Sequence, residues 1–401
     1  MPETTAAQER PRLLVFNHYY GPGESTGQLI REMCEDLIAD IDVTAVAATP
    51  SDEETKRMPY RGVDVRRAPA TTFAKGSIVL RLLNYLTFMA TAIPVALRGP
   101  RPQVVLCMTN PPFVGLLGAI VARLRRARLV ITVQDVHPDV GVISGRLTSG
   151  PAVWGLRQVM RYFFRRADRI VAISEPMRDR LVERGADAER VAVIGNWIDA
   201  EEITPQPRDN EWAREHGLAD EFVVMHAGNV GLLQDIETFV DAAEGAPEVR
   251  FVIVGEGANK EPLTERAAAK GLRNVTFLPR QPRESLDQLL ASADAHIVAL
   301  MPGLAGLMEP SKLYGVLAAS RPVLAGMEER TEAAQVVALC DCGVISTPGD
   351  PDSLVAAIRR LADLSAEERE RMGQRGREYC EQYCNRRRST GAYRDLILSL
   401  A

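Results

Sequence analysis

The sequence predicts an α/β protein made of two doubly wound domains that face each other across a cleft. Short apolar runs rich in Val and Ile alternate with helix-length segments along the chain, which is the pattern of parallel sheets covered on both faces. Twelve such runs fall within 401 residues, and two sheets of moderate size fit them better than one sheet of twelve strands. Ligands of such sheets bind beyond the carboxyl ends of the strands, so the cleft is the expected active site.

Each half of the chain contributes six of these strands, bounded by turn residues such as Gly, Pro, Asn and Asp. In the first half we expect strands at 12–18, 43–48, 104–109, 129–135, 169–174 and 191–196. In the second half we expect them at 222–228, 250–257, 275–279, 295–300, 322–326 and 343–348. The polar, Pro-punctuated segment between the halves predicts a linker at 201–218, between an N-terminal domain at 1–200 and a C-terminal domain from 219.

Charge is distributed unevenly along the chain. Residues 1–200 carry 26 basic and 21 acidic side chains, whereas 201–401 carry 22 and 32. The asymmetry is sharpest within 56–169, where 19 basic residues accompany four acidic ones. We therefore expect a cationic surface on the first domain. Nucleic acid is not expected as a partner, because aromatic residues for base stacking are few, at 5% of the chain.

An apolar segment lies inside this cationic region at 78–97. It has about the length of a membrane-spanning helix, but Arg81, Asn84 and Pro94 interrupt it. Two interpretations remain, a buried core helix and an interfacial helix at an anionic membrane surface. The flanking arginines favour the second, so we expect a membrane-facing segment at about 75–100.

The strand at 222–228 runs into a Gly-containing turn and then a helix. Gly228, Asn229, Gly231 and Gln234 occupy this turn. A strand, a turn and a helix N-terminus point backbone N–H groups at one spot, which suits phosphate. The glycines could equally just end the strand. Neither the P-loop pattern nor the dinucleotide glycine pattern is present.

A second candidate anion site is the run Glu309-Pro310-Ser311-Lys312. Pro310 suits the first turn of a helix, and Ser311 places a hydroxyl beside free backbone N–H groups. A lysine in the first turn opposes the helix dipole, so a bound anion explains Lys312 better than capping does.

Two further loops are expected to line the cleft from the first domain. Asp135, His137 and Asp139 follow the strand at 129–135, and they could hold a metal ion. We favour a histidine that donates to a substrate hydroxyl or phosphate, with no metal. The loop after the first strand carries Gly23, Glu24, Ser25, Thr26 and Gly27, which form either an acceptor-side loop or only a flexible turn.

Taken together, the motifs resemble the retaining glycosyltransferases of the GT-B fold, family four. The resemblance covers nearly the whole chain and rests on YYGPGESTG, DRIVAISEPMRDRL, VAVIGNWID, AGNVGLLQDIETFVDAA, FVIVGEG, FLPRQPRESLDQLLASADAHIVAL, EPSKLYGVLAASRPV and GVISTPGDPDSLVAAIRRL. The most similar branch is that of bacterial transferases that build surface polysaccharides, with Gly-Asn-x-Gly and Pro-Ser-Lys-x-Tyr motifs.

The resemblance implies that the domain at 219–384 binds a nucleotide sugar, that the domain at 1–200 binds the acceptor, and that a helix at 385–401 packs back on the first domain. It implies that the base lies against Pro279 and Arg280 and that the diphosphate meets Gly228, Asn229, Ser311 and Lys312. The other donor-site residues implied are Gly231, Gln234, Glu256, Pro310, Leu313 and Tyr314. It implies catalytic roles for His137, Lys312 and Glu309, and an acceptor-side place for Asp135.

The sequence departs from the family pattern at two places. Asn229 and Gln234 stand where much of the family has Arg and Lys, so Lys312 and helix N-termini must supply more of the charge. The paired glutamates of the family are also replaced: Gly315 stands at the ribose-binding position and Leu307 at the first, for which Glu309 is the candidate substitute. We therefore expect weaker or differently arranged ribose binding.

The leading hypothesis is a retaining, metal-independent transferase that moves a hexosyl group from a UDP-hexose or UDP-N-acetylhexosamine to a lipid-linked saccharide or polyprenyl-type acceptor, with no cofactor. The first fourteen residues show no secretory signal, which predicts a cytoplasmic protein attached to the inner face of the plasma membrane. Its oligomeric state is open between monomer and homodimer. Two alternatives remain, a UDP-sugar 2-epimerase of similar fold and a catalytically degenerate nucleotide-binding partner protein.

Overall fold

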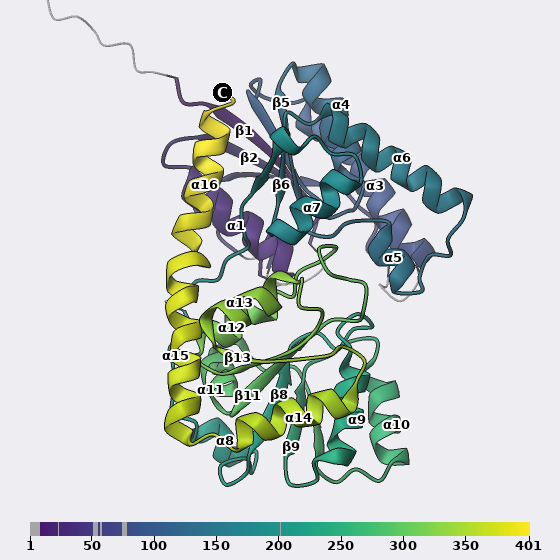
Figure 1. Ribbon diagram of the computed structural model, residues 1–401. Helices are drawn as coiled ribbons and strands as arrows, with labels where there is room; N and C mark the ends of the chain where they lie inside the picture. The colour runs from purple at the N-terminus through teal and green to yellow at the C-terminus, as the bar shows by residue number, and fades with distance from the viewer. Residues whose placement is uncertain (1–8, 23, 51–54, 57, 74–77, 201) are drawn as a thin grey trace, which may run out of the picture. The chain divides into compact units, whose positions relative to one another are not determined.

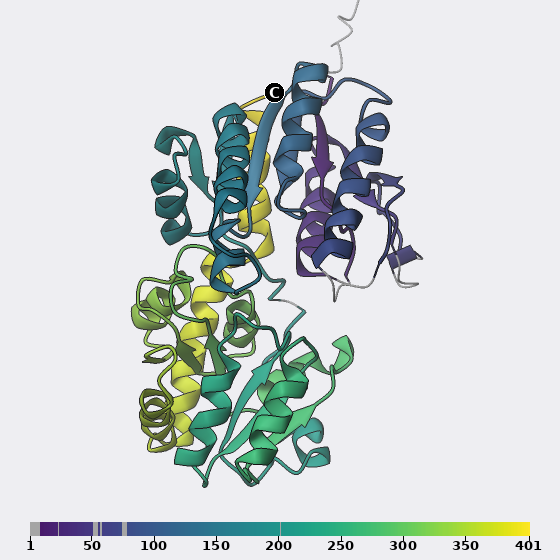
Figure 2. The same cartoon turned by 90° about the vertical axis from the view of Figure 1, so that its right-hand side faces the viewer.

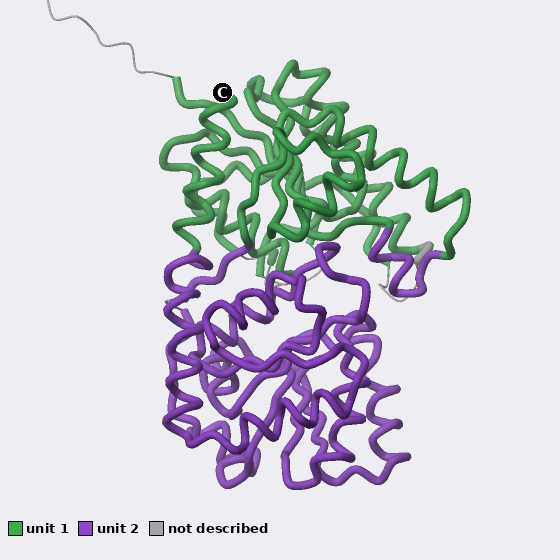
Figure 3. The backbone as a smooth tube through the Cα atoms, viewed as in Figure 1, with its two compact units in different colours: residues 1–138, 148–195, 386–401 green, residues 139–147, 196–385 purple. Residues whose placement is uncertain are grey.

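The chain divides into two compact units in a computed structural model that describes residues 9–22, 24–50, 55, 56, 58–73, 78–200 and 202–401. Unit 1 contains residues 1–138, 148–195 and 386–401, and unit 2 contains residues 139–147 and 196–385 (Figure 3). The chain therefore passes between the units four times, and a short helix, α5 (Asp139–Ile143), belongs to unit 2 although its neighbours in sequence belong to unit 1.

Unit 1 is built on a seven-stranded sheet in the order β3-β2-β1-β4-β5-β6-β7. All neighbouring strands are parallel. The strands are β1 (Arg12–Phe16), β2 (Asp42–Ala48), β3 (Asp64–Ala68), β4 (Val104–Met108), β5 (Arg128–Val133), β6 (Arg169–Ala172) and β7 (Val191–Val193). Every residue of β4 is buried, as expected for a central strand with helices on both faces.

Helices cover both faces of this sheet (Figure 1). On one side lie α1 (Ser25–Leu37) and α16 (Arg386–Leu398), which pack against each other. On the other side lie α3 (Ile78–Ala96), α4 (Val114–Arg125) and α6 (Pro151–Arg166). The helix α7 (Glu175–Glu183) follows β6, and Ser174 caps its N-terminus by accepting from the backbone N–H of Met177.

The C-terminal helix α16 is fastened to unit 1 by specific contacts. The Arg386 guanidinium donates to both carboxylate oxygens of Asp36 on α1, at 2.7 and 2.9 Å. Ser389 donates to the carbonyl of Gly195, and the hydroxyl of buried Tyr393 lies 3.2 Å from Oγ1 of Thr132 on β5. Residues near the end of the chain thus complete the unit that its beginning forms.

Unit 2 is built on a six-stranded parallel sheet in the order β10-β9-β8-β11-β12-β13. The strands are β8 (Val223–Ala227), β9 (Arg250–Val254), β10 (Val275–Leu278), β11 (Ala295–Ala299), β12 (Val323–Gly326) and β13 (Gly343–Ser346). The strand order runs outward from β8 to β10 on one side and from β11 to β13 on the other. The order therefore reverses between β8 and β11, and doubly wound sheets bind ligands at such a point.

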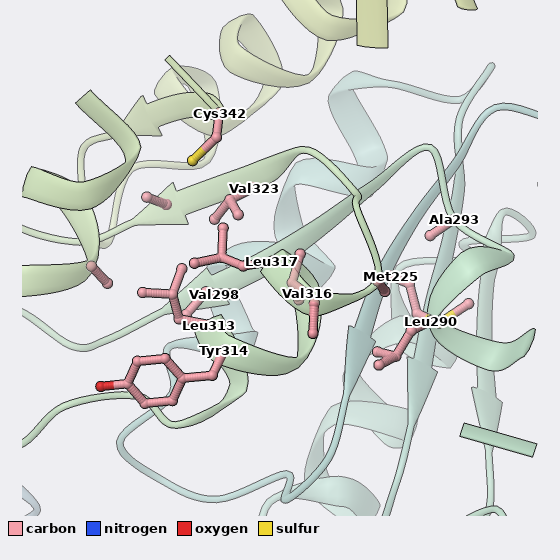
Figure 4. Packing of buried hydrophobic residues seen from close by; sticks show 14 of the residues in the cluster. Met225, Leu290, Ala293, Val298, Leu313, Tyr314, Val316, Leu317, Val323 and Cys342 are labelled. Carbon is pink, nitrogen blue, oxygen red and sulfur yellow. The ribbon is translucent and has the colours of Figure 1, made fainter. Parts of the chain in front are cut away.

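The helices of unit 2 bury two apolar clusters, one on each face of the sheet. Figure 4 shows the first, in which Leu313, Val316 and Leu317 of α12 pack beside Met225 and Val298. Besides α5, the helices of unit 2 are α8 (Glu211–Glu215), α9 (Ile236–Gly245), α10 (Lys260–Ala269), α11 (Leu286–Ala291), α12 (Lys312–Ala318), α13 (Glu332–Cys340), α14 (Pro351–Ala362) and α15 (Ala366–Tyr383). Ser365 and Glu368 form a capping box that sets the start of α15.

All twelve expected strands are present, and each starts within one residue of its expected start. Strands β2 and β12 end where expected, and the other ten end one to three residues earlier. Strand β3 was not expected, because its sequence DVRRA has two arginines where a strand pattern needs apolar residues. As an edge strand it keeps them at the surface, where Arg66 pairs with Asp64 at 2.6 Å.

The segment expected to be a linker, 201–218, contributes to the core of unit 2. Ile203, Trp212 and Leu218 are buried in its first apolar cluster. Asn210 caps α8 by accepting from the N–H of Ala213. Most of the polar residues that indicated a linker lie on the outer side of this segment, whose apolar residues are widely spaced.

Candidate functional site

The turn after β8 presents Gly228 and Asn229 at the surface of unit 2. Gly228 has φ +127° and donates its N–H to the carbonyl of Val254 at 2.8 Å. The turn after β9 runs directly beside it, since a Cβ on Gly255 would lie 1.9 Å from the Gly228 carbonyl oxygen. Backbone meets backbone here, and only glycine allows that approach.

The start of α12 lies against the same turn. A Cβ built on Gly228 would come within 2.7 Å of Cε of Lys312, so the lysine side chain crosses the face of the glycine. The two anion sites considered separately in the sequence, at Gly228–Gln234 and at Glu309–Lys312, are therefore one site. This arrangement suits the binding of a phosphate group better than either element alone, because it places a cation beside a turn of exposed backbone.

The protonation states in this site follow from burial. Burial lowers the pKa of Lys312 from its ordinary 10.5 to about 8. Burial, helped by the nearby charge of Lys312, also lowers the pKa of His226 to about 3, so that its imidazole is neutral at pH 7. Nε2 of His226 lies 3.3 Å from the carbonyl of Asn229 and supports the turn from below. The sequence did not indicate a role for His226 in this site, because a histidine inside an apolar strand is expected to be a buried core residue.

Two amide side chains flank Gly231 in the same turn. A Cβ on Gly231 would lie 2.5 Å from Oε1 of Gln234 and 2.7 Å from Nδ2 of Asn229. These amides stand where the resemblance places basic side chains, and they can donate hydrogen bonds to an anion without adding charge. Lys312 is then the cation that the structure shows against this turn.

The next turns along the sheet carry Glu256, Pro279 and Arg280, all exposed. The hydrogen bond from Lys260 at 2.8 Å lowers the pKa of Glu256, and Lys260 also donates to the carbonyl of Leu278. Gly255 donates its N–H to that carbonyl at 3.1 Å. The turns after β8, β9 and β10 are thus joined edge to edge, as their order in the sheet requires.

Residues 309–314 separate into exposed and buried members. Ser311 is exposed at the start of α12, and Glu309 and Pro310 are half-buried before it. The side chains of Leu313 and Tyr314, which the resemblance places in the donor site, lie in the apolar cluster of Figure 4 and are 3% and 5% exposed. Their packing holds α12 in position. Because both side chains are buried in the core, they do not support the expected direct contact with a ligand.

The remaining predicted residues belong to unit 1, except Asp139, which is buried at the start of α5 in unit 2. Asp135 and His137 follow β5, where His137 donates its N–H to the carbonyl of Asp135 at 3.1 Å. Burial raises the pKa of the Asp135 carboxyl, and His137 opposes that shift. Among the residues that the structure describes, no group of three His, Cys, Asp or Glu side chains could hold a metal ion.

The loop before α1 is attached to the end of β4. Gly23 lies outside the described residues, Glu24 precedes the helix and Ser25 is exposed. Nδ2 of Asn110 donates to Oγ1 of Thr26 at 3.0 Å. A Cβ on Gly27 would meet the Gly21 carbonyl oxygen at 2.8 Å, so this is a tightly packed turn rather than a loose one.

An aromatic cluster lies beside this loop and was not anticipated. The ring of His18 packs edge-on against those of Tyr19, Tyr85 and Phe88, with centroids 4.7–5.4 Å apart. Tyr85 and Phe88 come from α3. The available signal was the position of His18 and Tyr19 at the end of the first strand, in a loop for which the sequence leaves two interpretations, a cleft-lining loop and a flexible turn.

Comparison with known proteins decides the class. A family model described as Glycosyl transferase 4-like domain matches residues 21–197, and one described as Glycosyl transferases group 1 matches residues 208–379. The chain is a GT-B glycosyltransferase of the family-four type. These matches confirm two expectations from the sequence, that the protein is a glycosyltransferase and that it has a two-domain α/β fold.

Relatives of the transferase match it over most of their length. It is 27% identical over 366 residues to the probable glycosyltransferase WbjE of Pseudomonas aeruginosa, covering 88% of the transferase and 90% of WbjE. It is 27% identical over 375 residues to the putative colanic acid biosynthesis glycosyl transferase WcaI of Escherichia coli, covering 87% and 91%. The crystal structure of Anabaena HepE in complex with UDP and glucose shares its fold, with a TM-score of 0.77 at 17% identity over 97% of the transferase and 100% of HepE.

Proposed function

We propose that this transferase moves a sugar from UDP-hexose or UDP-N-acetylhexosamine to a lipid-linked saccharide or polyprenyl-type acceptor, with retention at the anomeric carbon, in the synthesis of a cell-surface polysaccharide. The name of WcaI, which assigns that relative to colanic acid biosynthesis, supports the pathway class. The UDP and glucose bound to HepE support the donor class.

The observation that carries the proposal is the approach of Lys312 to Gly228. Negative charge grows on the leaving diphosphate as the glycosidic bond breaks, so donors fixed at that position lower the barrier. Lys312 supplies a cation held by packing, and Asn229 and Ser311 supply polar groups beside it. An anion next to Lys312 also raises the pKa of its ammonium back toward the ordinary value.

The step we propose is a front-face substitution. The bond between the anomeric carbon and the diphosphate oxygen breaks, the bond to the acceptor oxygen forms on the same face, and the acceptor proton passes to the leaving phosphate oxygen. His137 is the candidate contact for the donor sugar, and Glu309 is the candidate substitute for the first of the family's paired glutamates. Asp135 and the loop at 23–27 are candidates for the acceptor side.

A thermal-shift panel of UDP, GDP, ADP and their sugars tests the donor. UDP compounds should raise the melting temperature, because a ligand at a hundredfold over its dissociation constant stabilises by about 2.7 kcal/mol. Lys312→Ala should abolish that shift and lower the transfer rate by about 10²-fold or more. Lys270→Ala is the matched control, since Lys270 pairs with Asp241 and Glu244 on α9.

Product analysis separates the transferase from the epimerase. With donor and no acceptor, the transferase should return unaltered UDP-sugar with slow hydrolysis. An epimerised UDP-sugar would overturn the proposal, and so would a full UDP-dependent shift in Lys312→Ala. Absence of both transfer and hydrolysis with every UDP-sugar would instead favour a degenerate nucleotide-binding protein.

The proposal of a lipid-linked acceptor depends on α3, whose sequence lies in the cationic region of unit 1. No described helix is long and apolar enough to cross a membrane. Leu82, Leu83 and Leu86 of α3 are nevertheless 41–52% exposed. We propose that this exposed apolar side of α3 brings the transferase to an anionic membrane surface, where its acceptor lies.

A further inference from the structure

Three helices form a continuous face of unit 1. Figure 2 shows α3, α4 and α6 side by side, and α4 packs against both of its neighbours. None of the residues in 78–96, 114–125 and 151–166 is Asp or Glu. The same helices carry seven arginines, at positions 81, 123, 125, 157, 161, 165 and 166. The α3–α4–α6 face therefore has one sign of charge.

Large apolar side chains are exposed on the same helices. Besides the leucines of α3, Leu124 of α4 is 59% exposed, and Trp154 and Tyr162 of α6 are 65% and 47% exposed. Half of the exposed large hydrophobic side chains among the described residues lie on these three helices. Such a concentration of exposed apolar side chains indicates a surface that binds another protein or a membrane.

The helix α6 orders these side chains by its period. Trp154, Arg161 and Arg165 stand seven and four residues apart, which puts them on one side of a helix, and all three are exposed. Met160 and Phe163 occupy the opposite, buried side. The guanidinium of Arg166 lies 5.3 Å above the ring of Tyr162. Aromatic rings beside cations at the surface suit the boundary between lipid headgroups and acyl chains.

We propose that the α3–α4–α6 face docks on an anionic lipid bilayer and that α6 is a second anchor, with Trp154 inserted at the lipid–water boundary and Arg161 and Arg165 on the lipid phosphates. The proposal deepens the lipid-acceptor part of the proposed function and rests on it. It extends the contact beyond α3, the segment that the sequence indicated.

Other occupants fit the face less well. A second copy would bring arginines against arginines, because the face has no carboxylate to pair with them. Nucleic acid would use the arginines but would leave exposed leucines without a partner. A bilayer with anionic headgroups accommodates both the charge and the apolar side chains.

The tryptophans provide a direct readout. The chain has three, and Trp197 and Trp212 are buried at 5% and 4% exposure, whereas Trp154 is open to solvent. Vesicles of phosphatidylglycerol should shift the emission of the whole protein to shorter wavelength and protect it from acrylamide, and vesicles of phosphatidylcholine should not. In Trp154→Phe both changes should disappear, although the protein still floats with the vesicles.

Flotation measures the anchor itself. Trp154→Ser and the double variant Arg161→Glu/Arg165→Glu should each reduce the fraction bound to phosphatidylglycerol vesicles several-fold, whereas Leu339→Ser, which changes a 77% exposed leucine of unit 2, should not. The UDP-dependent thermal shift of every variant should match the wild type, which separates lost docking from lost folding.

Flotation of the α6 variants equal to that of the wild type would overturn the proposal, as would equal binding to neutral and anionic vesicles. A wild type that dimerises through Trp154 but does not float would overturn it in favour of a self-interface. Failure of the proposed function shows separately, as loss of the UDP shift or of transfer to a water-soluble saccharide acceptor.

Discussion

The Cε atom of Lys312 occupies the space where a side chain on Gly228 would begin, with 2.7 Å between Cε and a Cβ built there. This contact joins the turn after β8 to the start of α12. Because the turn must be bare for the lysine to cross it, the glycine and the cation depend on each other.

Gly228→Ala should therefore displace Lys312 as well as strain the backbone at φ +127°. We expect a loss of about 1–3 kcal/mol in stability and loss of the UDP-dependent thermal shift. Gly271→Ala is the control, because Gly271 has φ +67° with nothing within 4 Å of the new Cβ. If Gly228→Ala keeps full UDP affinity, the lysine does not bind the diphosphate from this position.

UDP affinity should depend on the charge of Lys312. Its pKa of about 8 means that the ammonium is present below pH 8 and is lost above it. Isothermal titration of UDP should show affinity falling as the pH rises from 7 to 9.5. In Lys312→Arg that fall should be absent, since arginine stays protonated. An unchanged fall in the arginine variant would assign it to another group.

The same shift has the opposite sign for stability. Burial disfavours the charged form, so its cost is full below pH 8 and disappears as the pH rises from about 8 to the ordinary 10.5. Relative to Lys312→Met, the ligand-free wild type should thus gain stability across that range. Denaturant titrations of the two proteins at pH 7 and 10 measure the difference.

The two sides of α3 should respond differently to a charge. Leu86 is 52% exposed, whereas Phe88 is fully buried against His18. Leu86→Asp should leave the melting temperature nearly unchanged and reduce vesicle binding. Phe88→Asp should unfold unit 1, because it buries a carboxylate without a partner. Equal melting temperatures for the two variants would contradict the orientation of the helix.

Tyr393 tests the docking of the C-terminal helix. Tyr393→Phe removes the hydroxyl that meets Thr132 at 3.2 Å and should cost about 1 kcal/mol. Tyr393→Ala should cost about 3–5 kcal/mol, because it empties a fully buried site. Urea unfolding measures both. Comparable small losses would show that α16 is held mainly by its surface ion pairs.

The sheet architecture could be predicted because buried parallel strands have the most distinctive pattern in a sequence. The exceptions have local causes. Strand β3 needs only one neighbour and can carry Arg66 and Arg67, so its pattern is that of a loop. The segment 139–147 joins unit 2, which no local pattern records.

The candidate site was predictable in its parts but not in its assembly. Turn and helix-start motifs identified Gly228 and Lys312 separately, because each has a local reason to bind an anion. Their contact comes from the order of strands β8 and β11, which is long-range information. Local patterns also could not show which side chains at the start of α12 are exposed. Ser311 is exposed, whereas Leu313 and Tyr314 are buried in the core.

The return of residues 386–401 to unit 1 has a consequence for synthesis in the cell. Unit 1 lacks the helix that contacts Asp36 and Thr132 until residues 386–401 have been synthesised. Unit 2, which spans 196–385 apart from one short segment, can fold earlier. A nascent chain stalled before residue 386 therefore carries unit 1 without α16, with Asp36 and Thr132 lacking their partners Arg386 and Tyr393.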